Sequence, residues 1–186
     1  MLTERYTEAL SYAARVHRDQ VRKGTSIPYL SHLLAVSSLV MEHDGDEDEA
    51  IAGLLHDVVE DVGRDQAPAI AQRFGARVLD IVLGCTDADT FPKPPWRERK
   101  ERYLTHLDTA PASVLLVSCC DKLHNATAIL HDLERIGPAV FERFTAGREG
   151  TLWYYRRLAD TFTRLGAPPA ARLGGVVARL EGAAAA

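Results

Sequence analysis

Four side chains that can bind a metal or exchange a proton lie close together at His56, Asp57, Glu60 and Asp61. The residues around them are largely apolar, so this stretch should run through the interior of the protein. On a helix, residues four apart share a face, which places three carboxylates on adjoining stripes. Partial burial makes their mutual repulsion more costly. A divalent transition metal would relieve it, because imidazole and carboxylate are suitable ligands; the alternative is a solvated acidic helix end.

Neighbouring residues on one helix cannot surround an ion, so further ligands must come from other segments. His32 lies on the apolar side of its predicted helix, where it is either a satisfied core residue or a ligand. Asp121 follows an apolar run in a long predicted helix and needs a cationic partner if it is buried. Lys122 should point away from it, so the partner is expected on another helix. A metal site with open positions for water and phosphate oxygens would then consist of His32, His56, Asp57 and Asp121.

The elements that must position these residues are helices. Most segments have helical periodicity and none alternates over enough residues for a strand, so we predict an all-α fold, a helical bundle. We expect one domain over 1–186, with a core of about 3–165 and a C-terminal helix and tail over 166–186. The stretch 87–95, with three prolines, is predicted to be a loop, and 182–186 to be frayed. Helices are predicted over 3–19, 29–42, 46–61, 66–73, 76–85, 96–107, 111–133, 139–165 and 170–180.

Composition limits the partners. The 22 Lys and Arg against 26 Asp and Glu give a net charge of −4, which argues against nucleic acids and anionic membranes as binding partners. The three cysteines are an odd number and two are adjacent, as expected for reduced thiols. The N-terminus has no signal-peptide pattern and no segment approaches the ~20 apolar residues of a membrane span. We therefore expect a cytoplasmic protein; the sequence does not indicate its oligomeric state.

The order of these ligand candidates resembles the HD phosphohydrolase superfamily. Longer strings resemble, in sequence and order, the hydrolase domain of bifunctional alarmone synthetase/hydrolases and their small stand-alone relatives, over about residues 3–165. The strings are HRDQVRKG (17–24), PYLSH (28–32), LLHDVVED (54–61), FG (74–75) and DKLHN (121–125).

This resemblance implies an HD-domain helical bundle that uses Mn²⁺ and hydrolyses the 3′-pyrophosphate of guanosine tetra- or pentaphosphate to GDP or GTP and pyrophosphate. It implies that His32, His56, Asp57 and Asp121 hold the metal. It also implies that Glu60 and Asp61 orient or activate the attacking water. On chemical grounds they could instead hold His56 or metal-bound waters.

The substrate is then a small nucleotide, and the resemblance assigns residues to it. Arg22 and Lys23 match a basic pair at the nucleotide site, and Asn125 matches a residue near the ribose and the scissile phosphate. Tyr155 matches a tyrosine that contacts the nucleotide, although aromatic residues at helical spacing here could simply be core. The basic cluster over 96–100 is either a phosphate clamp or, as we favour, a solvated helix face.

Two departures from the family pattern remove no ligand. Leu33 stands where a proline often follows the histidine ligand, and Cys119 and Cys120 precede Asp121 where a small or basic residue followed by alanine is commoner. Nothing beside Cys120 marks it as a nucleophile.

Two other functions share most of these residues. One is a phosphatase acting on NADPH or another nucleotide, and the other is a nucleotide-sensing module without catalysis. The acidic pair speaks against the sensing module, which has no evident need for it. The bifunctional relatives carry synthetase domains after the hydrolase domain, and nothing of that size follows Leu165, so synthesis is expected to be absent.

Overall fold

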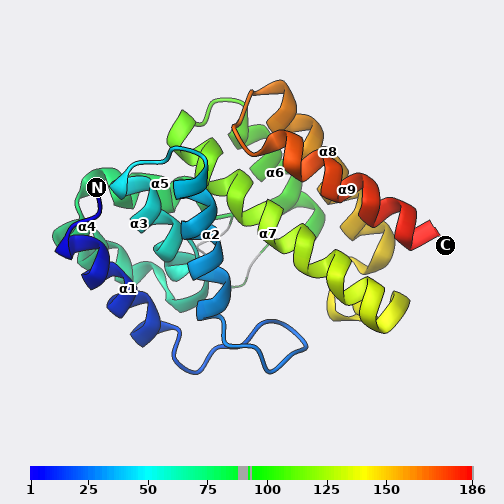
Figure 1. Cartoon of the computed structure of the whole chain (residues 1–186), viewed down its shortest axis with the longest axis horizontal. Helices are drawn as coiled ribbons and strands as arrows, with labels where there is room; N and C mark the ends of the chain where they lie inside the picture. Colours follow the sequence, from blue (N-terminus) through cyan, green and yellow to red (C-terminus); the bar gives the residue numbers. More distant parts are fainter. Residues whose placement is uncertain (88–91, 93, 186) are drawn as a thin grey trace.

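One long helix, α7 (Ala112–Ile136), runs between two groups of helices (Figure 1). This computed structural model describes residues 1–87, 92 and 94–185. On one side of α7 lie α1 (Glu4–Val16), α2 (Leu30–Glu42), α3 (Glu47–Leu55), α4 (Ala67–Phe74) and α5 (Ala76–Cys85), and on the other α6 (Trp96–Leu107), α8 (Gly147–Arg164) and α9 (Ala170–Ala185). Short segments complete the chain: a π-helical turn over Val58–Val62 and 3-10 turns over Arg64–Gln66 and Gly137–Arg143.

The all-α prediction is confirmed: over the described part of the chain the structure has helices and no strand, only an isolated bridge between Val21 and Pro28. Local sequence explains where α3 begins. Asp46 and Glu49 form a reciprocal capping box at the start of α3. None of the described helices is long and apolar enough to cross a membrane. Most of the predicted loop at 87–95 lies outside the described residues.

Three predicted helices differ from the structure. The helix predicted over 46–61 ends at Leu55 and continues as the π-helical turn. The helix predicted over 139–165 begins only at Gly147, whose φ of 59° is in the left-handed region that other residues rarely adopt. The predicted fraying of 182–186 is wrong as far as the described residues go, because α9 extends to Ala185 and Ala184 is buried. The small side chain of Ala184 packs where we expected nothing to anchor the chain.

Each side of α7 contributes to its own hydrophobic cluster. The first contains Leu33, Ile51, Leu55 and Phe74 from α2 to α4, together with Val117 of α7. The second contains side chains of α6, α8 and α9 packed on the opposite side of α7, including Leu107, Leu158, Phe162, Leu173 and Leu180. α7 is therefore packed from both sides, which fixes the positions of the polar side chains that it carries.

Helices α2 and α3 approach each other closely at Gly53. A Cβ atom added there would lie 3.0 Å from the Ser37 Cα and 3.2 Å from the Ser37 nitrogen, both backbone atoms of α2. Ser37 also donates a hydrogen bond of 2.8 Å to the Ala50 carbonyl oxygen. Glycine thus permits the spacing that brings α2, with His32, beside the end of α3, with His56.

Replacing Gly53 with alanine is expected to lower the free energy of unfolding by about 1–3 kcal/mol, because the added methyl group overpacks the α2–α3 contact. Denaturant unfolding measures the effect. The matched control is Gly175→Ala in α9, where the added Cβ meets nothing within 4 Å. That change should raise stability by about 0.5–1 kcal/mol. Equal effects of the two substitutions would contradict the close approach.

Candidate active site

Two histidines and two aspartates converge where α2, α3 and α7 meet. Ligand atoms of His32, His56 and Asp57 all lie within 4.8 Å of one another. His56 Nε2 is 3.0 Å and His32 Nε2 is 3.7 Å from Asp57 Oδ2. Asp121 adds an oxygen, Oδ1, 3.2 Å from His32 Nε2 and 3.6 Å from His56 Nε2. The structure thus brings together all four residues predicted to bind a metal.

Both imidazole rings direct a buried Nε2 at these carboxylates, and neither Nε2 makes a hydrogen bond with any described residue. His56 Nδ1 donates to the Gly53 carbonyl oxygen, 2.9 Å away, which leaves Nε2 to face the carboxylates. Burial alone would lower the pKa of His56, but Asp57 and Asp121 raise it well above its usual value, so a metal bound here would displace the proton from Nε2. His32 Nδ1 is 2.8 Å from Nδ1 of His124. Burial, with His32 nearby, lowers the pKa of His124 to about 4, so at pH 7 His124 is neutral and its Nδ1 can accept a hydrogen bond from the His32 Nδ1–H group. These residues fit a divalent metal, because ligand histidines commonly donate their other N–H in this way.

The two carboxylates of the cluster are held in their ionised form. Burial alone would raise the pKa of Asp57, but His56 keeps it well below the usual value. Burial would likewise raise the pKa of Asp121, and there Lys122 keeps it low. Tyr29 donates a hydrogen bond of 2.5 Å from its hydroxyl group to Asp57 Oδ2. Both carboxylates can therefore bind a cation near neutral pH without first losing a proton.

The prediction that Lys122 points away from Asp121 is wrong. Lys122 Nζ contacts Asp121 Oδ2, so the cationic partner of this aspartate comes from its own helix. The long, flexible lysine stem curls back, and its ammonium group lies 5.3 Å from the centre of the Tyr103 ring. Asn125, one turn further along α7, donates to Asp121 Oδ1 at 2.5 Å.

Glu60 and Asp61 lie on the π-helical turn rather than on a continuous α-helix. Here Gly63 N–H donates to the Val58 carbonyl oxygen at 3.2 Å, five residues back. Glu60 is half-buried and accepts a 3.4 Å hydrogen bond from the Asp87 N–H. Asp61 is exposed and accepts a 2.7 Å bond from Gln20 Nε2. Such π turns are frequent at functional sites, and this one gives the two carboxylates separate surroundings.

A cavity of about 330 Å³ opens beside the cluster, and three of the residues predicted to bind substrate, Arg22, Lys23 and Asn125, line it. Arg22 Nη2 donates to Asn125 Oδ1 at 2.7 Å, and Asn125 in turn contacts Asp121. The cavity is thus joined to the candidate metal site by hydrogen bonds. Lys23 is exposed at its edge.

Tyr155 is not among the residues that line this cavity. Its side chain is 8% exposed within the hydrophobic cluster of α6 to α9. Burial, reinforced by the charge of Asp121, raises its pKa. Tyr155 thus occupies the core position that we considered as the alternative, and its contact with a nucleotide stays a prediction.

The basic cluster over 96–100 divides between two surroundings. The preferred interpretation, a solvated face, is wrong for Arg99 and Lys100, whose side chains are 13% and 18% exposed. Arg99 Nη1 lies 2.7 Å from Asp87 Oδ1, and Lys100 Nζ contacts Asp87 Oδ2. Since the Asp87 N–H binds Glu60, this buried group of charges borders the acidic pair.

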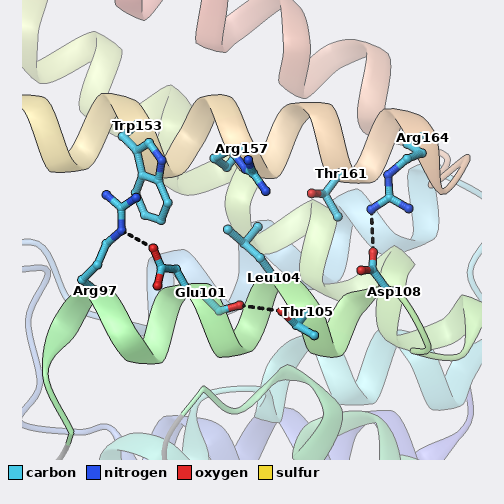
Figure 2. A pocket seen from close by; sticks show the side chains of 9 residues that line it. All are labelled: Arg97, Glu101, Leu104, Thr105, Asp108, Trp153, Arg157, Thr161 and Arg164. Atoms are coloured by element: carbon cyan, nitrogen blue, oxygen red, sulfur yellow. Dashed lines mark hydrogen bonds and ion pairs between the residues drawn. The ribbon is translucent and has the colours of Figure 1, made fainter.

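Arg97, on the outer face of α6, instead lines a second cavity, of about 300 Å³, between α6 and α8 (Figure 2). Its guanidinium carbon is 3.3 Å from the centre of the Trp153 ring, and its Nε pairs with Glu101 at 2.6 Å. Further along, Arg164 pairs with Asp108 at 2.5 Å. Carboxylates already neutralise two of the three arginines in this groove, and the four residues of the histidine–aspartate cluster do not line it.

Cys120 does not behave as an activated thiol. Burial, together with the charge of Asp121, raises its pKa to about 12, so the thiol stays protonated at neutral pH. The three cysteines are free and buried.

Two contributors to the site were not assigned a role from the sequence. His124 follows Asp121 by three residues on a predicted helix, so helical spacing could have placed it on the same face. Tyr29 precedes His32 by three residues and could have been found in the same way. Asp87 carried no comparable signal, because its partners are distant in sequence.

Replacing Asp87 with asparagine is expected to lower the free energy of unfolding by about 2–3 kcal/mol, because Arg99 and Lys100 lose a largely buried partner. Burial would raise the pKa of Asp87, but Lys100 and Arg99 hold it below the usual value. A lowered carboxyl pKa adds stability above the unfolded value of about 3.9, and that stability is lost as the pH falls through the folded value.

The stability difference between the wild type and Asp87→Asn should therefore be constant from about pH 7 to 5 and shrink below about pH 4. Urea unfolding across this pH range measures it. Asp160→Asn, at an exposed position on α8, is the matched control and should change stability little. A difference that does not depend on pH would contradict the ion pair.

Comparison with known proteins identifies the family. A family model for the HD domain matches residues 9–152. The guanosine-3′,5′-bis(diphosphate) 3′-pyrophosphohydrolase MESH1 of Drosophila melanogaster is 33% identical over 133 residues, which cover 70% of each protein. The GTP pyrophosphokinase of Myxococcus xanthus is 29% identical over 82% of this chain, but the match covers only 22% of that protein.

The fold is shared as well. The solved structure of a metazoan ortholog of SpoT that hydrolyses ppGpp is similar over 95% of both chains, with a TM-score of 0.78 and 27% identity. This likeness confirms the predicted HD-domain helical bundle. The chain belongs to the HD-domain family of metal-dependent phosphohydrolases, within the group typified by alarmone hydrolase domains.

Proposed function

We propose that this protein hydrolyses the 3′-pyrophosphate of guanosine tetra- or pentaphosphate and releases GDP or GTP and pyrophosphate. The observation that carries the proposal is the pair of unbonded, buried Nε2 atoms of His32 and His56 beside two ionised carboxylates, at the edge of a basic cavity. Relatives named for this hydrolysis support the choice of substrate.

His32, His56, Asp57 and Asp121 would hold the metal. Two imidazoles and two carboxylates suit Mn²⁺, our proposed cofactor, although the general affinity order for divalent ions would let Zn²⁺ bind more tightly. A divalent cation there would polarise a phosphate oxygen and lower the pKa of water.

Glu60 and Asp61 would orient the attacking water and accept its proton. A carboxylate suits this task if it lies within hydrogen-bond reach of the water and its pKa is near the working pH. Their separate partners, the Asp87 N–H for Glu60 and the Gln20 amide for Asp61, suggest that the two differ in role.

The cavity would bind the nucleotide. Arg22 and Lys23 supply positive charge for phosphate or for stacking on the base, and Asn125 lies between Arg22 and Asp121, where the ribose and the scissile phosphate would meet. Tyr155 does not line this cavity, so its contact with the nucleotide would require its side chain to become accessible when substrate binds.

A small nucleotide is the only partner that we propose; nucleic acids and membranes are not. The cytoplasm is our proposed location, and the three free, buried cysteines are compatible with a reducing compartment.

Removing the metal should lower stability as well as activity, because the carboxylates then repel one another without a cation between them. We expect the protein treated with EDTA to unfold at a temperature about 5–10 °C lower than the protein saturated with metal. Manganese should restore both properties. Differential scanning fluorimetry and a turnover assay measure the two effects. If His56→Ala and Asp57→Ala keep both full metal content and full turnover, the assigned site is wrong.

The second test identifies the bond that breaks. Water should attack the phosphorus attached to the 3′-oxygen, so hydrolysis in ¹⁸O-labelled water should place the label in pyrophosphate and leave the 3′-hydroxyl group unlabelled. Mass spectrometry of the products measures this. Label in the 3′-hydroxyl group would mean attack at carbon, and release of orthophosphate alone would mean stepwise cleavage.

The same assay should include NADPH and deoxynucleotides. Faster turnover of NADPH than of guanosine tetraphosphate would favour the alternative phosphatase function, and metal and nucleotide binding without any turnover would favour a sensing module.

A further inference from the structure

His17 is a buried histidine outside the proposed metal site. It ends α1, is 2% exposed, and has its Nδ1 2.6 Å from the side-chain oxygen of Gln20. An amide oxygen can only accept, so His17 Nδ1 carries the proton. Nε2 is buried and has no hydrogen-bond partner among the described residues.

His17 thereby fixes the orientation of the Gln20 amide. With its oxygen facing His17, Gln20 turns its NH₂ group toward Asp61 and donates a 2.7 Å hydrogen bond to Oδ2. If the amide flipped, its oxygen would face the carboxylate and repel it. The Gln20 backbone is also fixed, since its N–H donates to the His17 carbonyl and its carbonyl accepts from the Tyr29 N–H.

The same histidine supports the opposite side of the site. Its ring packs against that of Tyr29, with ring centres 5.5 Å apart, and the Tyr29 hydroxyl group donates to Asp57. One buried ring thus contacts the residue that holds Asp57 and the residue that holds Asp61.

Stability alone does not account for this arrangement. Asp61 is exposed, and an exposed hydrogen bond contributes little to folding. Burying His17 leaves one nitrogen without a hydrogen bond, which is unfavourable. The unfavourable burial of His17 is thus linked to the direction of one amide group, that of Gln20, which points at the Asp61 carboxylate.

We propose that Gln20 is a positioning residue that holds the Asp61 carboxylate in its working orientation, and that His17 sets the direction of the Gln20 amide. The inference rests on the proposed function, in which Asp61 orients the attacking water.

The test uses the full chain and guanosine tetraphosphate with Mn²⁺. Gln20→Met keeps the approximate size of the side chain but removes the donor, and should lower kcat about 10- to 100-fold with KM changed less than about twofold. Gln66→Met is the matched control, because the Gln66 side chain binds Tyr12 and Asp65, and its loss should leave kcat unchanged. His17→Asn, whose amide can replace Nδ1 as donor, should retain most of kcat, whereas His17→Leu should lose as much as Gln20→Met.

Non-additivity separates positioning from a structural role. If Gln20 acts through Asp61, adding Gln20→Met to Asp61→Asn should cause no further loss of kcat. A further loss equal to that in the wild-type background, or a kcat of Gln20→Met within twofold of the wild type, would overturn the inference.

One readout does not depend on turnover. The side-chain amide resonances of Gln20 should shift in Asp61→Asn and in His17→Leu, and should stay in place in Gln66→Met. Unshifted resonances would overturn the inference even in an active enzyme. An inactive wild type with shifted resonances would instead overturn the proposed function and leave the hydrogen-bond chain established.

Discussion

The site depends on keeping negative charge ionised inside the protein. Asp121 is buried and Asp57 is largely buried, which by itself favours their protonated forms. His56 and Lys122 reverse that preference. The cost of assembling these groups is met by packing on both sides of α7, where two separate hydrophobic clusters hold Asp121 in place.

α7 also determines how the site connects to the cavity. Asp121 and Asn125 lie one turn apart on one face, and Lys122 and His124 lie between them. Each contacts a different part of the site: Asn125 reaches Arg22, His124 reaches His32, and Lys122 returns to Asp121. A single rigid element thus sets the distance from the candidate metal ligands to the nucleotide-binding residues.

The sequence was sufficient for those parts of the molecule that depend on local pattern. Helical periodicity predicted the all-α fold, and buried polar residues in apolar surroundings pointed to the four residues that converge. It was insufficient where distant contacts decide the outcome. The ammonium group of Lys122 contacts Asp121 and lies over the Tyr103 ring of α6, and Arg99 and Lys100 turn inward because Asp87 is there. The end of α3 at Leu55 could not be predicted either, since its apolar periodicity continues into Val58 and Val59.

The π-helical turn at Val58–Val62 has a consequence for how this protein can vary. It accommodates more residues per turn than an α-helix, and each residue of an α-helix rotates the chain by about 100°. Deleting one residue here would let α3 continue as a regular α-helix. Glu60 and Asp61 would then be rotated about the helix axis, away from their present partners. Most of the hydrophobic packing of α3 would be unaffected. An insertion or deletion in this segment should therefore displace the acidic pair together with the buried Val58 and Val59, which makes segment length, and not only residue identity, a feature to compare among relatives.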